Sequence, residues 1–146
     1  MTAVVDAGAI IALVDEHDPA HGRVRVALER ERGELFIPAP ITAEVDYMLG
    51  RRFGRVERLT FLDDLAAGRL RVACLDAADH AVVATLERRY EQLDAGLADL
   101  SAVVVAGRVG TTRIVTFDER HFRTFRQLQG GHFTLLPADE PDASGE

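Results

Sequence analysis

The sequence has a single cysteine, no tryptophan and no lysine, and each scarcity excludes a class of site. One cysteine, Cys74, permits neither an internal disulfide nor a zinc site built from cysteine pairs. It lies in an apolar run, residues 72–75, which predicts a buried thiol. Without lysine the chain has no amine for a Schiff base, no P-loop lysine and no lysine to activate a serine. Because only 6% of the residues are aromatic, a platform for stacking nucleobases would have little material.

Long apolar runs are also missing. The first one is broken at Asp6, so it is not expected to act as a signal peptide, and none reaches the roughly 20 residues that a membrane span needs. We therefore expect no membrane association and a cytoplasmic location. The 146 residues suffice for one globular domain, which we assign to residues 1–136. Residues 137–146 are acidic and rich in small residues, and they predict a disordered tail.

The charge is unbalanced, with a net value of -7, and all 17 basic residues are arginine. Phosphate contacts supply most of the affinity of nucleic-acid binders, so an acidic chain is a poor general binder of RNA or DNA. Any activity on RNA would therefore need cations that neutralise the protein's own carboxylates. Metal ions meet this requirement.

Short apolar segments alternate with helical patterns along the chain. The pattern predicts strands at residues 2–5, 35–37, 70–73, 113–117 and 132–136. It predicts helices at residues 7–14, 19–32, 41–53, 56–67, 77–93 and 100–107. Such alternation is typical of a parallel sheet covered by helices on both faces. The sequence thus predicts an α/β fold, with three α/β/α layers around a central, mainly parallel sheet of four to five short strands.

Four acidic residues are predicted to meet at one edge of this sheet. In an open α/β sheet, ligands bind outside the carboxyl ends of the strands, where the following helices begin. Two of the acids follow predicted strands and two lie near the start of predicted helices. They are Asp6, Glu44, Asp99 and Asp118. Carboxylates held together repel one another unless they share a cation, and oxygen ligands without cysteine suit Mg²⁺ or Mn²⁺.

Each acid also has a simpler interpretation. Aspartate is a favoured N-cap, so Asp6, Asp99 and Asp118 are each open to a capping role. Glu44 is open to the role of a solvated helix residue. Only the joint pattern favours a metal site, because helix caps need not lie on strands that are adjacent in space. Metal-assisted hydrolysis of a phosphodiester bond is the chemistry that such a site supports.

At these residues the chain resembles the PIN-domain family, and within it the VapC-type ribonuclease toxins of bacterial type II toxin–antitoxin systems. The matching segments are residues 5–10, 43–47, 96–101 and 116–122. No single segment is specific, but the ordered set with its spacing is, and it spans residues 1–136. The resemblance assigns the family's catalytic, metal-binding acids to Asp6, Glu44, Asp99 and Asp118. One departure is the Ala7-Gly8 pair, where the family's first motif usually carries a serine or threonine.

The resemblance also implies a reaction and partners. It implies a Mg²⁺- or Mn²⁺-dependent endoribonuclease that hydrolyses tRNA, rRNA or mRNA and thereby inhibits translation. It further implies a homodimer that a cognate VapB-type antitoxin neutralises by inserting a basic tail into the acidic site. Thr116 matches a hydroxyl position of the family, and we expect it to hydrogen-bond near the site or contact substrate; a plain strand threonine is the alternative.

Arginines cluster at the predicted turn between the third and fourth helices. Arg51, Arg52 and Arg55 are candidate contacts for RNA phosphates, with Arg58 nearby, and a solvated helix face is the equal alternative.

Other polar residues near the four acids are given structural roles. Asp46 lies two residues from Glu44, on a different face of the helix, and is predicted to be solvated. Asp94 is predicted to lie in a loop and is weighed as an additional ligand. His121 is expected to pack at the surface rather than act as a general acid.

Two other classes of function remain to be weighed. A receiver domain or an aspartate-nucleophile phosphatase would be expected to use a lysine, which this chain lacks. The phosphatase pattern also requires a second aspartate at the position of Gly8. A catalytically silent PIN-like binding module is the alternative that stays open. The presence of all four acids argues against it.

Overall fold

A computed structural model describes residues 1–31 and 33–141 of the chain. The strands are β1 (Ala3–Val5), β2 (Leu35–Pro38), β3 (Arg71–Ala73), β4 (Arg113–Val115) and β5 (Thr134–Leu136). The α-helices are α1 (Ala7–Val14), α2 (His21–Arg30), α3 (Ala39–Arg52), α4 (Arg55–Ala66), α5 (Ala77–Arg89), α6 (Gly96–Val109) and α7 (Glu119–Thr124). A short 3₁₀ helix, η1 (Glu91–Leu93), follows α5. No helix in these described residues is long and apolar enough to cross a membrane.

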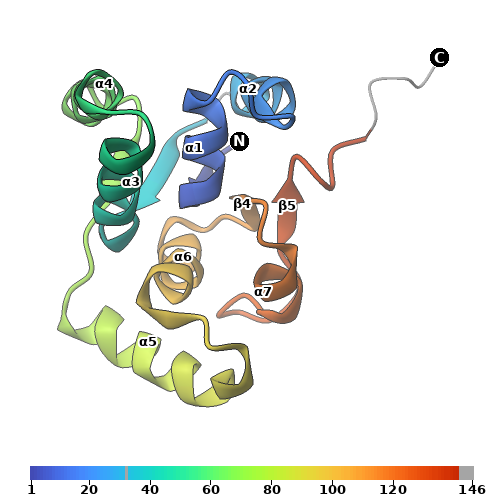
Figure 1. Cartoon of the computed structure of the whole chain (residues 1–146). Coiled ribbons are helices and arrows are strands. Elements are labelled where there is room, and N and C mark those ends of the chain that lie inside the picture. Colours follow the sequence, from blue (N-terminus) through green and yellow to red (C-terminus); the bar gives the residue numbers. More distant parts are fainter. Residues whose placement is uncertain (32, 142–146) are drawn as a thin grey trace.

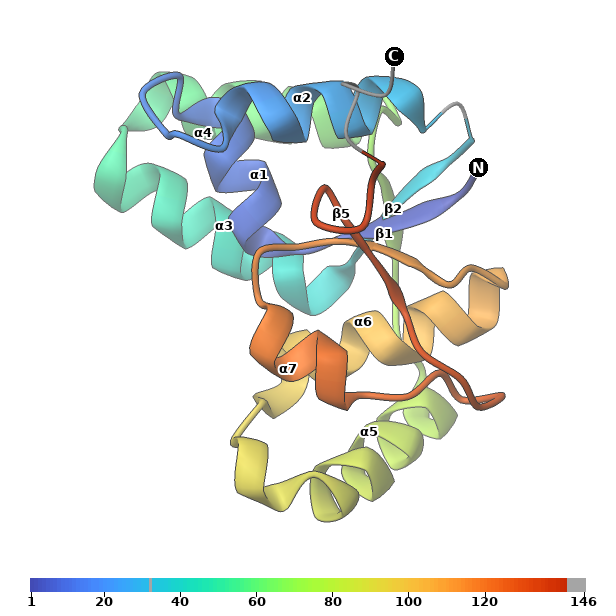
Figure 2. The same cartoon turned by 90° about the vertical axis from the view of Figure 1, so that its right-hand side faces the viewer.

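The five strands form one sheet in the order β3-β2-β1-β4-β5, and every neighbouring pair is parallel. Helices α1 to α4 lie on one side of the strands and α5 to α7 on the other (Figure 1, Figure 2). The predicted three-layer α/β fold is therefore confirmed. Because all strands run the same way, their carboxyl ends share one edge, and the central strands β1 and β4 bring the segments that follow them together there.

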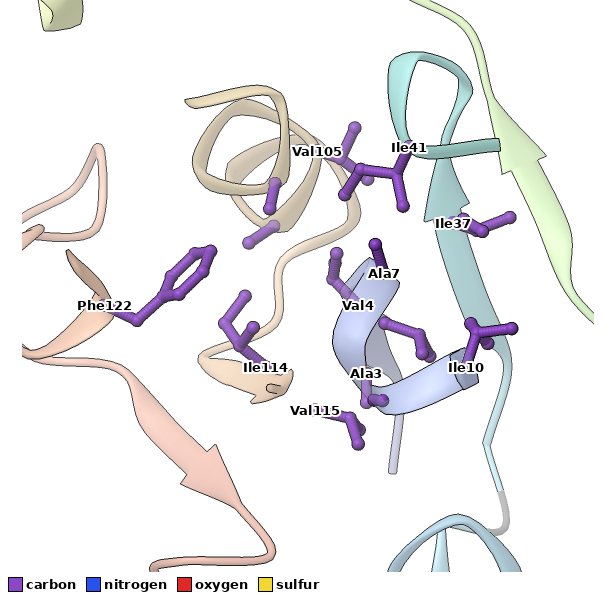
Figure 3. Close-up of a cluster of buried hydrophobic side chains, with 14 of the residues drawn as sticks. Ala3, Val4, Ala7, Ile10, Ile37, Ile41, Val105, Ile114, Val115 and Phe122 are labelled. Atoms are coloured by element: carbon purple, nitrogen blue, oxygen red, sulfur yellow. The ribbon is translucent and has the colours of Figure 1, made fainter. Parts of the chain in front are cut away.

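The core lies where the central strands contact α1, α3 and α6. Ala3 and Val4 on β1, Ile114 on β4 and Val105 on α6 point into it (Figure 3). Seven successive residues of α6, from Leu100 to Ala106, are buried, so this helix is enclosed on all sides rather than amphipathic. Such a helix has little freedom to shift, and it holds its first turn in place at the sheet edge.

Several boundaries differ from the prediction. Helix α6 begins at Gly96, four residues earlier than expected, and α7 was not expected at all because its six residues are too few for a helical pattern. The predicted helix over residues 77–93 ends at Arg89, where a 3₁₀ turn takes over. Cys74 is exposed, so its predicted burial is wrong; its position after the edge strand β3 leaves it uncovered.

The chain remains ordered beyond β5. Residues 137–141 turn back on the strand, and Asp139 accepts a hydrogen bond from the backbone of Leu135 at 2.7 Å. Arg123 donates to the same carboxylate at 2.6 and 2.8 Å, and Arg30 lies 3.4 Å from Glu140. The start of the predicted tail is thus fastened to α2 and α7, while residues 142–146 lie outside the described residues. The assignment of residues 1–136 as the domain stays a prediction.

A buried ion pair fastens the end of α2 to the central strand β4. The Arg113 Nε donates to the two carboxylate oxygens of Glu31 at 3.0 and 3.1 Å, and a terminal guanidinium nitrogen donates as well. The Glu31 side chain is 2% exposed and that of Arg113 18%. Removing one partner of such a pair leaves a buried charge unpaired.

We predict that Glu31→Gln lowers the free energy of unfolding by about 3 kcal/mol, the lower end for a broken buried pair because Arg113 keeps some contact with water. Urea unfolding measures it. The control is Asp64→Asn, which disrupts the exposed Arg69–Asp64 pair and should cost less than about 1 kcal/mol. Equal losses in the two variants would show that the Glu31 pair is no more important than a surface contact.

Candidate metal-binding active site

All four predicted acids line one hollow at the carboxyl edge of the sheet. The hollow has a volume of about 530 Å³. It is lined by Asp6, Ala7, Gly8, Glu44, Met48, Asp99, Phe117 and Asp118. Their elements are far apart in sequence: the β1–α1 junction, α3, α6 and the segment after β4. The tertiary structure therefore assembles the cluster that the sequence pattern predicts.

Asp6 occupies the centre of this arrangement, where β1 ends and α1 begins. Its backbone N–H donates to Val115 on β4 at 2.9 Å, which ties it to the neighbouring strand. One carboxylate oxygen accepts from the N–H of Ala7 at 2.9 Å, so Asp6 is also the N-cap of α1. The other accepts from the hydroxyl of Thr116 at 2.8 Å. Asp6 therefore caps α1 and belongs to the acidic cluster at the same time.

Thr116 positions the acids rather than facing the hollow. It is 1% exposed, donates its hydroxyl to Asp6, and accepts from the backbone N–H of Asp118 at 3.0 Å. The predicted hydrogen bond near the site is present, and the burial of Thr116 leaves its side chain almost no surface for a substrate contact. The single hydroxyl links the two acids that follow the central strands, supplying the orientation that the missing hydroxyl after Asp6 would otherwise give.

Asp99 lies in the first turn of α6, the fourth residue of the helix. The capping interpretation does not apply to it, because the N-cap is Ala95 and makes no side-chain capping bond. Glu44 lies in the second turn of α3, with its side chain on the rim of the hollow. Neither side chain caps a helix, whereas those of Asp6 and Asp118 do. Their clustering therefore needs another explanation.

His121 was expected at the surface, and this expectation is wrong. Its Nδ1 lies 2.9 Å from an Asp99 oxygen and 2.8 Å from an Asp118 oxygen, and its Nε2 lies 3.0 Å from the carbonyl of Leu93. A carbonyl only accepts, so Nε2 carries a proton, and two carboxylates at Nδ1 favour a second one. The signal in the sequence is the spacing of the two residues. His121 follows Asp118, the N-cap of α7, by three residues, so the two side chains lie at the same helical turn.

Charge repulsion and burial shift the pKa values of the cluster. Burial raises the pKa of Asp6, against the lowering effect of its bonds from Thr116 and Ala7. Burial and then the charge of Asp6 raise the pKa of Asp99 from 3.8 to about 6. The same two causes raise the pKa of Glu44. Burial alone would lower the pKa of His121, but Asp118 and Asp99 outweigh it and raise the value. The acids carry more negative charge than the site stabilises.

The donor set fits a hard divalent cation. Asp99, Asp118 and His121 each offer one ligand atom, and these atoms lie within 4.8 Å of one another. The surrounding donors are carboxylate oxygens, the type that Mg²⁺ and Mn²⁺ prefer, with no cysteine near. Raised pKa values in three neighbouring acids are what a site built around a missing positive charge should have. Without a cation, a protonated His121 would supply part of that charge; to act as a ligand, its Nδ1 would have to lose the proton.

Two of the clustered arginines already have carboxylate partners. Arg58 Nε lies 3.2 Å from Asp46, and the same nitrogen donates weakly to the Asp46 carbonyl. Arg52 lies 3.9 Å from Asp15, with both side chains partly exposed. Asp46 does not line the hollow, and its pair with Arg58 is partly exposed. Both observations agree with the solvated role predicted for Asp46.

Arg51 and Arg55 are exposed and have no carboxylate within 4.0 Å in the described part of the chain. Arg51 lies two helical turns after Glu44 on the same face of α3, with its guanidinium 5.8 Å from the centre of the Tyr47 ring. Asp94, the other residue weighed as a ligand, lies in a left-handed turn with φ 50° and does not line the hollow.

The raised pKa of Asp99 gives a prediction about stability without metal. A carboxyl whose folded pKa is about 6 destabilises the folded state above pH 6, and this penalty disappears as the pH falls toward 3.8. Asp99→Asn should therefore melt at a higher temperature than the wild type at pH 8 in a chelator. The gain should shrink by pH 5. A variant that melts lower than the wild type at pH 8 would mean that Asp99 is needed for the fold.

The sequence and the fold both match known proteins. A PIN-domain model matches residues 3–128. Ribonuclease VapC26 of Mycobacterium tuberculosis is 33% identical over 134 residues, which cover 92% of this chain and 99% of that protein. The sarcin-ricin loop cleaving toxin VapC20 of Mycobacterium tuberculosis has a similar fold, with a TM-score of 0.73 at 18% identity over 80% of this chain and 89% of that one.

Two solved complexes contain further chains with this fold. VapBC2 of Rickettsia felis, bound to a DNA fragment from its promoter, matches with a TM-score of 0.65 at 16% identity, covering 92% of this chain and 97% of that one. FitAcB of Neisseria gonorrhoeae matches with a TM-score of 0.60 at 16% identity, covering 80% and 88%. The match across residues 3–128, together with the VapC26 identity over nearly the whole chain, shows that this protein belongs to the PIN-domain family, in the VapC group.

Proposed function

We propose that this protein is a Mg²⁺- or Mn²⁺-dependent endoribonuclease toxin that cuts tRNA, rRNA or mRNA in the cytoplasm and so inhibits translation. The observation that carries the proposal is the convergence of four acids in one hollow, with raised pKa values in three of them and with His121 in contact with two. The 33% identity to ribonuclease VapC26 over 92% of the chain supports the same reaction class.

In the proposed site, the four acids would bind the cation together. Asp6 and Asp99 would hold the cation, with Glu44 and Asp118 completing the set of metal-binding, catalytic acids. A bound divalent cation supplies positive charge that activates a water molecule and stabilises the leaving oxygen of a phosphodiester. Thr116 fixes Asp6 and the backbone of Asp118, so both carboxylates keep their orientation without reorganising.

His121 belongs to the positioning part of the site. It holds Asp99 and Asp118 together from one side while its Nε2 is fastened to the carbonyl of Leu93. In the protonated form it keeps the two carboxylates close before a cation binds. In the neutral form, Nε2 keeps its proton and still donates it to the carbonyl of Leu93. Nδ1 then has a lone pair that faces the carboxylate oxygens of Asp99 and Asp118.

The partner proposed is a cognate VapB-type antitoxin. An acidic hollow attracts a basic segment, whose guanidinium can neutralise carboxylates as a cation does. Helix α4, which packs against α3, exposes a stripe of apolar side chains at Val56, Leu59 and Leu62 that would gain from coverage by an apolar partner segment. The family resemblance further supports a homodimer. The competing function, a catalytically silent PIN-like module, would keep the partner and lose the cleavage.

We predict that the wild type cleaves single-stranded RNA in Mn²⁺ and that chelation abolishes the reaction. Asp6→Asn and Asp99→Asn should each reduce the rate at least about 100-fold, as expected for the loss of a group that holds a catalytic cation. The control is Asp46→Asn, which removes the same charge one helical face away and should cleave normally. Wild-type RNA cleavage that persists in the two ligand variants would refute the assignment.

We also predict that Arg51→Gln with Arg55→Gln weakens RNA binding and flattens its salt dependence. Each lost phosphate contact should reduce the slope of log affinity against log salt by about 0.7 for a single strand. Titrations at several salt concentrations, in an Asp99→Asn background that leaves the RNA intact, measure this slope. Arg88→Gln with Arg89→Gln, at the exposed end of α5, removes the same charge elsewhere. Equal slopes in the two double variants would return Arg51 and Arg55 to a solvated face.

A further inference from the structure

The aromatic side chains of this protein are few, but their exposure is not random. Nine residues are Phe or Tyr, and of these only Tyr47 and Phe117 have a substantially exposed side chain, at 62% and 40% exposure. Only Phe117 lines the acidic hollow, and Tyr47 lies on the helix that carries Glu44. Tyr47 is one turn from Glu44 on α3, and Phe117 directly precedes Asp118 and lines the hollow. The expectation that the chain has little material for a stacking platform therefore needs revision at this one place.

Among the described residues, Phe117 is the one substantially exposed ring that contacts neither another aromatic ring nor a guanidinium. In the described residues, Tyr90, Phe122 and Phe125 pack against other aromatic rings, and Tyr47 lies under the guanidinium of Arg51. Phe117 has neither kind of contact, although burial of a phenyl ring is strongly favoured. The exposed part of this ring lines a negatively charged hollow, where it offers an apolar surface to a ligand.

The backbone around Phe117 is fixed on both sides. The N–H of Thr116 donates to Leu136 on β5 at 3.0 Å, and the N–H of Asp118 donates to the Thr116 hydroxyl at 3.0 Å. A ring held this way loses little conformational freedom when a ligand packs on it. Gly8 lies next to this ring, since a Cβ added to Gly8 would be 4.0 Å from Phe117 Cδ2, which is van der Waals contact. The absence of a side chain at Gly8 leaves that edge of the ring uncovered.

We propose that Phe117 stacks against the nucleobase next to the scissile phosphate and so positions that nucleotide over the acids. This inference rests on the proposed ribonuclease function. A phenyl ring beside phosphate-handling acids offers a flat apolar surface to the base attached to that phosphate. Any base has a π face, so the contact selects for unstacked nucleotides rather than for one sequence.

The stacking contact needs a base with a free face. Bases in an A-form duplex are stacked on their neighbours and do not present a free face to a side chain, whereas splayed bases do. Phe117 therefore acts as a substrate-positioning residue that draws a splayed nucleotide toward Asp6 and Asp118.

The test begins with a short single-stranded RNA that the wild type cuts at one site in Mn²⁺. Phe117→Leu should reduce kcat/KM by about 5-fold or more, and Phe117→Trp should restore it, because stacking needs an aromatic face and not bulk alone. Leu128→Ala is the matched control: Leu128 is 42% exposed and packs beside Gly107, at the other end of α6 from Asp99, so cleavage should be unchanged.

A binding experiment separates stacking from a general disturbance of the site. In an Asp99→Asn background, replacing the base beside the cut with an abasic nucleotide should weaken binding about 5-fold or more when Phe117 is present. It should have almost no effect with Phe117→Leu and regain its effect with Phe117→Trp. Equal sensitivity to the abasic nucleotide in the Phe and Leu proteins would overturn the inference.

The outcomes also distinguish this inference from the function on which it rests. RNA cleavage that requires Mn²⁺ and Asp99 but is as fast in Phe117→Leu as in the wild type overturns the stacking role alone. A wild type that cleaves no RNA in Mn²⁺ overturns the proposed function, and the stacking role with it. Circular dichroism and thermal melting of each variant verify that the fold is intact.

Discussion

The pairing of β1 with β4 at the centre of the sheet is the constraint on which the site depends. It brings the residue that ends one strand, Asp6, beside the segment that follows the other, where a single hydroxyl on Thr116 bonds to Asp6 and to the backbone of Asp118. The buried helix α6 then fixes Asp99 opposite them. Sheet register, rather than any local motif, therefore sets the geometry of the acids.

Structural and chemical roles overlap in these residues. Asp6 and Asp118 each cap a helix, and a cap needs an ionised or at least an accepting carboxyl at a fixed point. Burying such carboxyls, and then holding them close together, costs free energy, which appears as the raised pKa values of Asp6 and Asp99. His121 offsets part of this repulsion with its own positive charge. The residual excess of negative charge is what makes a cation, or a basic partner segment, a suitable ligand.

The surface around the hollow divides between charge and apolar contact. The uncommitted arginines lie on one flank, at the end of α3 and the start of α4, while the exposed ring of Phe117 lies among the acids. Electrostatic attraction to phosphate acts over several ångströms and does not require a fixed geometry, whereas stacking does. The arginines accordingly lie on exposed helix ends, whereas Phe117 lies in a hydrogen-bonded turn.

The sequence alone determined the α/β class, the parallel sheet and the four acids, because strand and helix periodicity and the carboxyl-edge rule depend on local pattern and on topology. It did not reveal α7, whose six residues carry too short a pattern, or the role of His121, which appears only when α7 folds back toward α6. Nor did it separate Arg51 and Arg55 from their neighbours, since ion pairing with Asp15 and Asp46 is decided by side chains that meet through space. Burial, pairing and pKa are properties of surroundings, and only tertiary packing supplies the surroundings.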